Sequence, residues 1–248
     1  MKMIISPAKK MRTDTDTYPV RSVPVLLNRT RRIMDYMKAL TYPEAKKLWK
    51  CNDKIAEENF ERFRCMDLTK CLTPAIISYV GIQYQYMAPG VFSQSELEYT
   101  EAHLNILSGF YGVLRPFDGV TPYRLEMQAK ACVEQAKDLY EFWGDIIYRC
   151  VMQDNDDRTV INLASKEYSR CVEQYLTDQD VFITCVFGEL SGGKVIQKGT
   201  QAKMARGEMV RYMAAHQVEK TEELKQFSGL GYAFDAERSG EREYVFLK

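Results

Sequence analysis

The sequence contains few residues that could hold a metal ion. Its 248 residues include two histidines, His103 and His216, and seven cysteines that form no Cys-x-x-Cys pair. Zinc sites need clustered Cys and His ligands at short spacings, so the sequence predicts no metal site and no cofactor. We expect the cysteines to behave as small hydrophobic core residues in a reducing compartment.

Long apolar runs are also absent. The first one, Met3–Ile5, is stopped by Ser6 and Pro7, and no later run approaches the ~20 residues that a membrane-spanning helix needs. A secretory leader needs a longer apolar stretch as well. The sequence therefore predicts a cytoplasmic protein without a membrane partner.

The sequence lacks internal repeats, low-complexity segments and long Gly/Ser/Pro linkers, which predicts a single domain over residues 1–248. It has no P-loop, no Gly-x-Gly-x-x-Gly and no Gly-x-Ser-x-Gly motif. No Cys/His dyad stands out. Motifs therefore assign no catalytic residue, and they leave open whether the chain is an enzyme.

The chain also has no net charge, because 34 Lys and Arg residues balance 34 Asp and Glu residues. A uniformly basic surface for nucleic acid is thus excluded. The charge is nevertheless uneven: residues 1–50 hold twelve basic and four acidic residues (+8), and residues 194–211 hold five and one (+4). If the two stretches meet in the fold, they form a region that attracts phosphates. The alternative is two separate solvated faces paired with nearby acids.

Helical patterns dominate residues 22–152, where Thr41 with Glu44 and Ser93 with Glu96 form capping boxes. Buried strands are predicted near both ends of the chain, at residues 3–5, 160–164, 181–187 and 195–197, with a terminal hairpin of 232–234 and 244–247. Residues 201–217 are predicted to form a further helix. This pattern favours an α+β fold with one mixed sheet built from N- and C-terminal strands and a large central helical section. A helical subdomain inserted into a sheet core is the alternative.

Four segments carry residue types suited to chemistry, and each also has a purely structural explanation. Ser6–Lys10 follows a strand, where α/β proteins often place ligand contacts. Leu107–Pro116 contains two glycines, as in glycine turns that present backbone N–H groups to phosphates, although a structural turn explains them too. Lys203 and Arg206 share a helix face, and Gly207 beside them indicates close packing or a ligand. Asp138–Asp145 could serve acid/base chemistry or be the solvated face of a helix.

Arg115 and Arg124 flank the stretch between Phe117 and Tyr123. Arginines bind phosphates or carboxylates with two parallel hydrogen bonds, which makes both of them candidates for ligand contacts. They could equally form ion pairs with Asp118 and Glu126.

Taken together, these segments resemble the YaaA family of bacterial peroxide-stress proteins. The resemblance runs nearly end to end and depends on a set of short motifs: ISPAK at residues 5–9, LSGFYGVLRPFDGVTPYRLEM at 107–127, DLYEFWGDII at 138–147, INLASKEY at 161–168 and KMARG at 203–207. The central block is long enough to be highly specific.

The resemblance implies a cytosolic protein that limits damage when peroxide meets intracellular iron. It also implies a compact α+β fold with a helix-hairpin-helix-like element, and non-specific binding of double-stranded or damaged DNA through a positively charged cleft. No protein partner is implied. Matching the motifs residue by residue gives five candidate DNA contacts: Lys9, Arg115, Arg124, Lys203 and Arg206.

Two alternatives to DNA binding stay open. One is an enzyme that acts on a phosphorylated or nucleotide-like substrate in the same cleft, with Glu126 or Asp145 as general acid/base. The other is direct iron binding, which the scarcity of ligands disfavours. The segment Gly81–Met87 departs from the family's Gly-Asp-hydrophobic-Tyr pattern, because the acid and a second glycine are missing.

Overall fold

A computed structural model describes all residues, 1–248, and confirms the α+β class. Its main sheet has the strand order β11-β12-β9-β8-β1-β5-β6, and β10 pairs with β9 at one side. The five strands β5, β1, β8, β9 and β12 run parallel, while β6, β10 and β11 are antiparallel to their neighbours. The strands are β1 (Lys2–Ile5), β5 (Leu104–Ser108), β6 (Gly112–Leu114), β8 (Thr159–Leu163), β9 (Val181–Ser191), β10 (Lys194–Ile196), β11 (Ala233–Phe234) and β12 (Glu243–Leu247).

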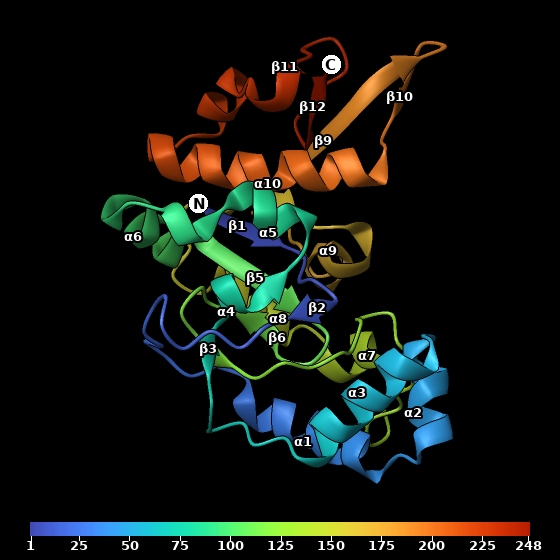
Figure 1. Cartoon of the computed structure of the whole chain (residues 1–248). Coiled ribbons are helices and arrows are strands. Elements are labelled where there is room, and N and C mark those ends of the chain that lie inside the picture. Colours follow the sequence, from blue (N-terminus) through green and yellow to red (C-terminus); the bar gives the residue numbers. More distant parts are fainter.

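Helices surround this sheet, with α10 and α5 side by side at one end of the molecule and α1, α2 and α3 at the other (Figure 1). Two short strand pairs, β2 (Lys10–Met11) with β4 (Tyr79–Val80) and β3 (Thr73–Pro74) with β7 (Gly119–Val120), lie outside the sheet. The helices are α1 (Leu27–Ala39), α2 (Tyr42–Trp49), α3 (Asp53–Arg64), α4 (Ala75–Ser78), α5 (Ile82–Met87), α6 (Gln94–His103), α7 (Leu139–Trp143), α8 (Ile146–Met152), α9 (Lys166–Glu173) and α10 (Gly199–His216), with short 3-10 turns η1 (Pro89–Val91), η2 (Thr221–Gln226) and η3 (Gly229–Gly231).

Local sequence signals explain several of these boundaries. The capping boxes predicted at Thr41 and Ser93 begin α2 and α6, where the cap side chains occupy N–H groups that have no helical partner. The turn at Gly192 and Gly193 returns the chain from β9 to β10, since both glycines have the positive φ angles that such hairpins require.

The central section is less helical than its sequence pattern predicts. Two of its segments, β5 and β6, join the sheet beside β1, and a long irregular stretch follows them. Asp138 caps α7, but Gly144 with φ of +54° ends that helix, and α8 starts anew after Asp145. Residues 139–152, which lie in the section with helical patterns, therefore form two short helices.

The cysteine prediction is wrong for three of the seven residues, because Cys65, Cys71 and Cys132 are exposed. Cys171 and Cys185 are buried as expected, and Cys51 and Cys150 are partly buried against the core. Burial also raises the pKa of the Cys171 and Cys185 thiols to about 12, so they stay protonated at neutral pH. The exposed thiols lie on surface segments, where the hydrophobic pattern of the sequence gives no signal.

This division predicts the thiol reactivity of the folded protein. At pH 8 a thiol reagent such as Ellman's should label Cys65, Cys71 and Cys132 rapidly, because only an accessible thiolate reacts. Cys171 and Cys185 should react only after unfolding in guanidinium chloride. Peptide mapping after timed labelling distinguishes these residues, and rapid labelling of Cys185 in the native protein would contradict the burial described above.

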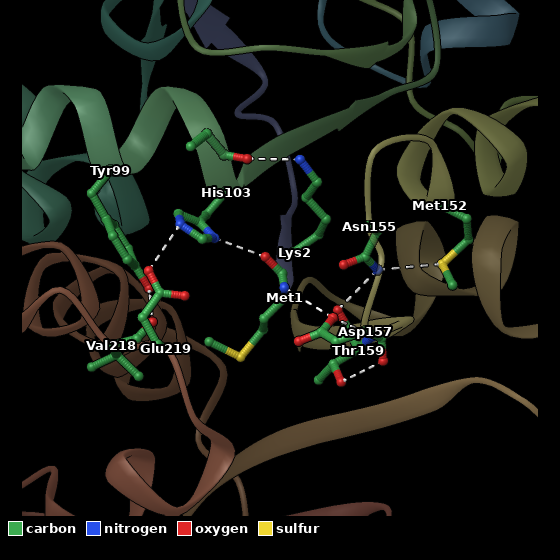
Figure 2. A network of polar contacts seen from close by, with 11 residues as sticks. Met1, Lys2, Tyr99, His103, Met152, Asn155, Asp157, Thr159, Val218 and Glu219 are labelled. Atoms are coloured by element: carbon green, nitrogen blue, oxygen red, sulfur yellow. Dashed lines mark hydrogen bonds and ion pairs between the residues drawn. The ribbon is translucent and has the colours of Figure 1, made fainter.

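A polar network fixes the amino end of β1, as Figure 2 shows. The α-amino group of Met1 lies 2.9 Å from Asp157 Oδ1, and Lys2 Nζ donates to the carbonyl oxygen of Ala102 (2.7 Å). His103 Nδ1 lies 2.8 Å from the carbonyl oxygen of Met1, which can only accept, so this nitrogen carries the proton. These contacts hold β1 against α6 and β8, and they give His103 a structural role.

At the opposite end, the carboxyl ends of β1 and β8 form a topological switch point. The two strands are parallel neighbours, yet the sheet continues from β1 to β5 on one side and from β8 to β9 on the other. The connections after the two strands therefore diverge and leave a crevice between them, which is where ligands bind in open α/β sheets. None of the helices in the structure is long and apolar enough to cross a membrane.

Candidate functional site

A cavity of about 380 Å³ lies at this switch point. A volume in this range suits a ligand of nucleotide size. Its walls come from the segments that follow β1 and β8, the start of α5, the residues around Arg124 and one face of α10. The polar and aromatic lining comprises Ser6, Lys9, Lys10, Gln83, Tyr84, Tyr123, Arg124, Glu126, Ser165, Glu167, Tyr168, Lys203 and Arg206.

Four of the five candidate residues lie together in this cavity: Lys9, Arg124, Lys203 and Arg206. The two basic stretches of the sequence therefore meet, as the uneven charge distribution suggested. With Lys10, the lining holds five cationic side chains against two acidic ones, which leaves a formal excess of three positive charges. Such an excess attracts anionic ligands.

The fifth candidate, Arg115, lies elsewhere. Its Nη2 forms an ion pair with Asp118 Oδ1 (3.2 Å), and its backbone N–H donates to Asp118 Oδ2 (2.8 Å). Asp118 is fully buried and also accepts a hydrogen bond from Ser22. Arg115 lines a smaller cavity of about 150 Å³ with Lys2, at the amino end of β1. Arg115 thus forms the ion pair with Asp118 that was the alternative to a ligand contact.

Glu126 connects two of the cavity cations. Its Oε1 lies 2.9 Å from Lys9 Nζ and 3.2 Å from Arg124 Nη2. The pair with Arg124 agrees with the alternative of local ion pairing. Asp145, the other acid/base candidate, pairs with Arg149 on the surface and does not line the cavity.

The cations of α10 have no such partner. No carboxylate lies within 4.0 Å of Lys203 or Arg206. Arg206 is largely buried, its Nε has no hydrogen-bond partner, and burial lowers the pKa of its guanidinium. Partial removal of an unpaired charge from water is unfavourable, so the position of this guanidinium costs stability in the empty protein. An anion in the cavity would compensate that cost.

Tight backbone packing holds the irregular segment that carries Arg124 and Glu126. Trp49 Nε1 donates to the carbonyl oxygen of Arg124 (2.6 Å) from one side. On the other side, a Cβ atom at Gly109 would lie 2.7 Å from the carbonyl oxygen of Leu125. Gly109 is therefore required for the close approach of two backbones.

The Leu107–Pro116 motif does not form a helix-hairpin-helix element. Its residues form the β5–β6 hairpin, and Ser108 Oγ accepts the backbone N–H groups of Phe110 and Tyr111 within the turn. A helix pair with a short connection occurs at α2 and α3, which Lys50–Asn52 join. The glycines of the motif thus serve a structural turn.

Gly207 also has a packing role. A Cβ atom at this position would lie 2.1 Å from the carbonyl oxygen of Gln83 and 2.9 Å from the backbone nitrogen of Met87. The neighbour that the sequence indicated is therefore the backbone of α5. Because α5 and α10 both line the cavity, this contact sets the distance between two of its walls.

The sequence reasoning missed Glu167, which lines the cavity from the first turn of α9. Its carboxylate is half-buried and accepts a hydrogen bond from the backbone N–H of Gln128 (3.2 Å). Burial raises the pKa of Glu167, and the nearby charge of Glu126 adds to that effect. Its position after the end of strand β8 is the signal that could have identified it.

Two serines join the loops after β1 and β8. The backbone N–H of Ser165 donates to Ser6 Oγ (2.8 Å), and the two hydroxyl oxygens lie 3.2 Å apart. The altered segment Gly81–Met87 lies at the same place: it forms α5, and Ile82 and Gln83 line the cavity. The chain's departure from the family pattern therefore falls within the site. No group of three or more His, Cys, Asp or Glu residues is arranged to hold a metal ion.

The fold and the cavity define an α+β protein with a basic pocket at the carboxyl ends of two parallel strands. The chain belongs to the family described as peroxide stress protein YaaA, whose profile matches residues 1–238. It is 54% identical over 248 residues to a UPF0246 protein of Lachnoclostridium phytofermentans, covering 100% of this chain and 96% of the relative. It is also 54% identical over 246 residues to a UPF0246 protein of Agathobacter rectalis, covering 99% and 98%.

Proposed function

We propose that this protein acts in the cytoplasm during peroxide stress and limits iron-dependent damage by binding DNA without sequence preference. The basic cavity receives a phosphate and its attached nucleotide at Lys203 and Arg206, while Lys9 and Lys10 contact neighbouring phosphates. Membership of a peroxide-stress family supports the physiological part of this proposal.

The observation that carries the proposal is the unpaired Arg206 in the cavity wall. Buried guanidinium groups normally face a carboxylate, and this one has none. A phosphate accepts two parallel hydrogen bonds from guanidinium and satisfies its charge. Lys203, one helical turn away on the same face of α10, would stabilise the same anion.

The proposal predicts a salt-dependent affinity that responds to Lys203. Lys203→Ala should weaken binding of a fluorescent duplex and reduce the slope of log K against log salt by about one, because one phosphate contact releases fewer counterions. Fluorescence anisotropy at several salt concentrations measures both quantities. The same measurement compares four ligands: intact duplex, duplex with a missing base, single-stranded DNA and free nucleotides. Their relative affinities show whether the site prefers DNA or a nucleotide.

Arg211→Ala is the matched control. Arg211 is exposed on the same helix and does not line the cavity, so its removal changes net charge equally. The control should keep the wild-type salt slope. Equal behaviour of the two variants would contradict a phosphate site at Lys203.

An enzyme acting on a phosphorylated or nucleotide-like substrate is the second candidate function. The half-buried Glu167 among cations favours it, because proton-transfer groups in active sites have shifted pKa values. Incubation of nucleotides or damaged DNA with the protein, followed by chromatography, tests it. Turnover by the wild type that disappears in Glu167→Gln would establish an enzyme. If the substrate stays unchanged with both proteins, binding is the remaining function.

A further inference from the structure

The cavity lining carries two chemically different kinds of charge. Lys203 and Arg206 of α10 present unpaired positive charge. Glu167 presents a carboxylate at the start of α9, where only hydrogen-bond donors or cations can satisfy it. A ligand that fills the cavity must therefore be anionic in one part and donate hydrogen bonds in another.

Aromatic side chains also line the cavity. They are Tyr84, Tyr123 and Tyr168, and all three are almost completely buried. The hydroxyl of Tyr84 donates to the carbonyl oxygen of Ser6 (3.0 Å), and that of Tyr123 is engaged with Tyr79 and Ser108. The hydroxyls of Tyr84 and Tyr123 are thus occupied within the protein, so these two residues contribute ring carbons to the lining, which suits a flat ligand.

Glu126 does not duplicate the role of Glu167. Lys9 and Arg124 already pair with Glu126, at 2.9 and 3.2 Å, so its charge is compensated inside the protein. The carboxylate of Glu167 accepts a hydrogen bond from the backbone N–H of Gln128 (3.2 Å) and forms no ion pair. A carboxylate has about four lone-pair positions, which leaves capacity for a ligand.

We infer that Glu167 recognises an amino group on a nucleobase, so that the ligand in the cavity is a nucleotide of guanine, adenine or cytosine. This inference rests on the proposed phosphate site at α10. The phosphate lies at Lys203 and Arg206, the base packs on the tyrosines, and the exocyclic amine donates to Glu167. Uracil, thymine and hypoxanthine lack that amine and offer only a ring N–H, so the half-buried carboxylate loses one donor.

The test compares nucleotides that differ by one amino group. Calorimetric titration of the full chain with GMP against IMP, and with CMP against UMP, should give affinities about 10- to 100-fold higher for the amino-bearing member. A site that hydrogen-bonds a polar group rejects an analogue lacking it, because its own buried group stays unpaired. Inorganic phosphate, which has no base, serves as the reference ligand.

Glu167→Gln identifies the residue responsible. Glutamine has nearly the same shape but one acceptor oxygen fewer, so the preference for GMP over IMP should fall to about threefold or less. Affinity for inorganic phosphate should not fall, because the substitution removes a negative charge from the cavity. Glu173→Gln, on the same helix and outside the cavity, should keep the full preference. A melting curve of each variant confirms that it is folded.

The results separate this inference from the proposed function. If wild type binds phosphate and all nucleotides equally, and Glu167→Gln changes nothing, the role of Glu167 is refuted while the phosphate site stands. If neither phosphate nor any nucleotide or DNA binds, both are refuted. A preference for GMP that survives Glu167→Gln would also overturn the assignment of this residue.

Discussion

Replacing Arg206 by methionine should weaken binding of both DNA and nucleotides by about 100-fold. Methionine fills a similar volume but cannot form the two charge-assisted hydrogen bonds that guanidinium offers a phosphate. Losing one partner of a buried charged pair costs about 2–5 kcal/mol, and every 1.4 kcal/mol is a factor of ten in affinity. Anisotropy titration with DNA and calorimetry with GMP measure the loss.

The same substitution should not destabilise the empty protein. Arg206 is largely buried without a carboxylate partner, and burial lowers the pKa of its guanidinium. An apolar side chain removes that desolvation cost, so the melting temperature of Arg206→Met should equal or exceed that of wild type. A variant that melts earlier and binds normally would show that Arg206 has a structural role.

Replacing Gly207 by alanine should have the largest effect on stability. The added methyl group would lie 2.1 Å from the carbonyl oxygen of Gln83, and backbone atoms cannot yield as a flexible side chain does. Overpacking of this kind typically costs 1–3 kcal/mol and at times more, against a gain of about 1 kcal/mol in helix propensity. We expect a net loss of about 2 kcal/mol, measured by urea denaturation.

Gly199→Ala is the matched control for this prediction. Gly199 lies in the first turn of the same helix, and a Cβ atom there would meet nothing within 4 Å. Its replacement should therefore be neutral or slightly stabilising. Gly207→Ala should also weaken ligand binding, since α5 carries Gln83 and Tyr84 of the cavity. Equal stability of the two variants would contradict the close packing of α5 and α10.

Much of the fold could be predicted because its signals are local. The strand at Met3–Ile5, the capping boxes at Thr41 and Ser93, and a strand near residues 195–197 depend on neighbouring residues, and the structure confirms them. Strand β5 was missed because its short apolar run, LNILS, fits a buried helix equally well. The break at Gly144 was missed because the apolar spacing continues across it.

The site was predictable to the extent that its residues lie in motifs. Lys9, Arg124, Lys203 and Arg206 were found from family motifs, and the structure brings them into one cavity. Arg115 belongs to the same motif as Arg124, yet its ion pair with Asp118 keeps it away. Glu167 resembles an ordinary acidic residue at the start of a helix. Its half-burial arises from the tertiary structure, which no spacing rule encodes. That these residues bind DNA stays a prediction.

The two tryptophans of this protein give the site a built-in optical signal. Trp49 hydrogen-bonds the backbone of Arg124, and Trp143 Nε1 donates to the carbonyl oxygen of Gly109 (3.1 Å), so both indole groups contact the backbone that supports the cavity. Indole emission responds to changes in hydrogen bonding and local polarity. A ligand that displaces this backbone should therefore change the emission of both tryptophans. The intrinsic fluorescence of the unlabelled protein then measures occupancy of the cavity.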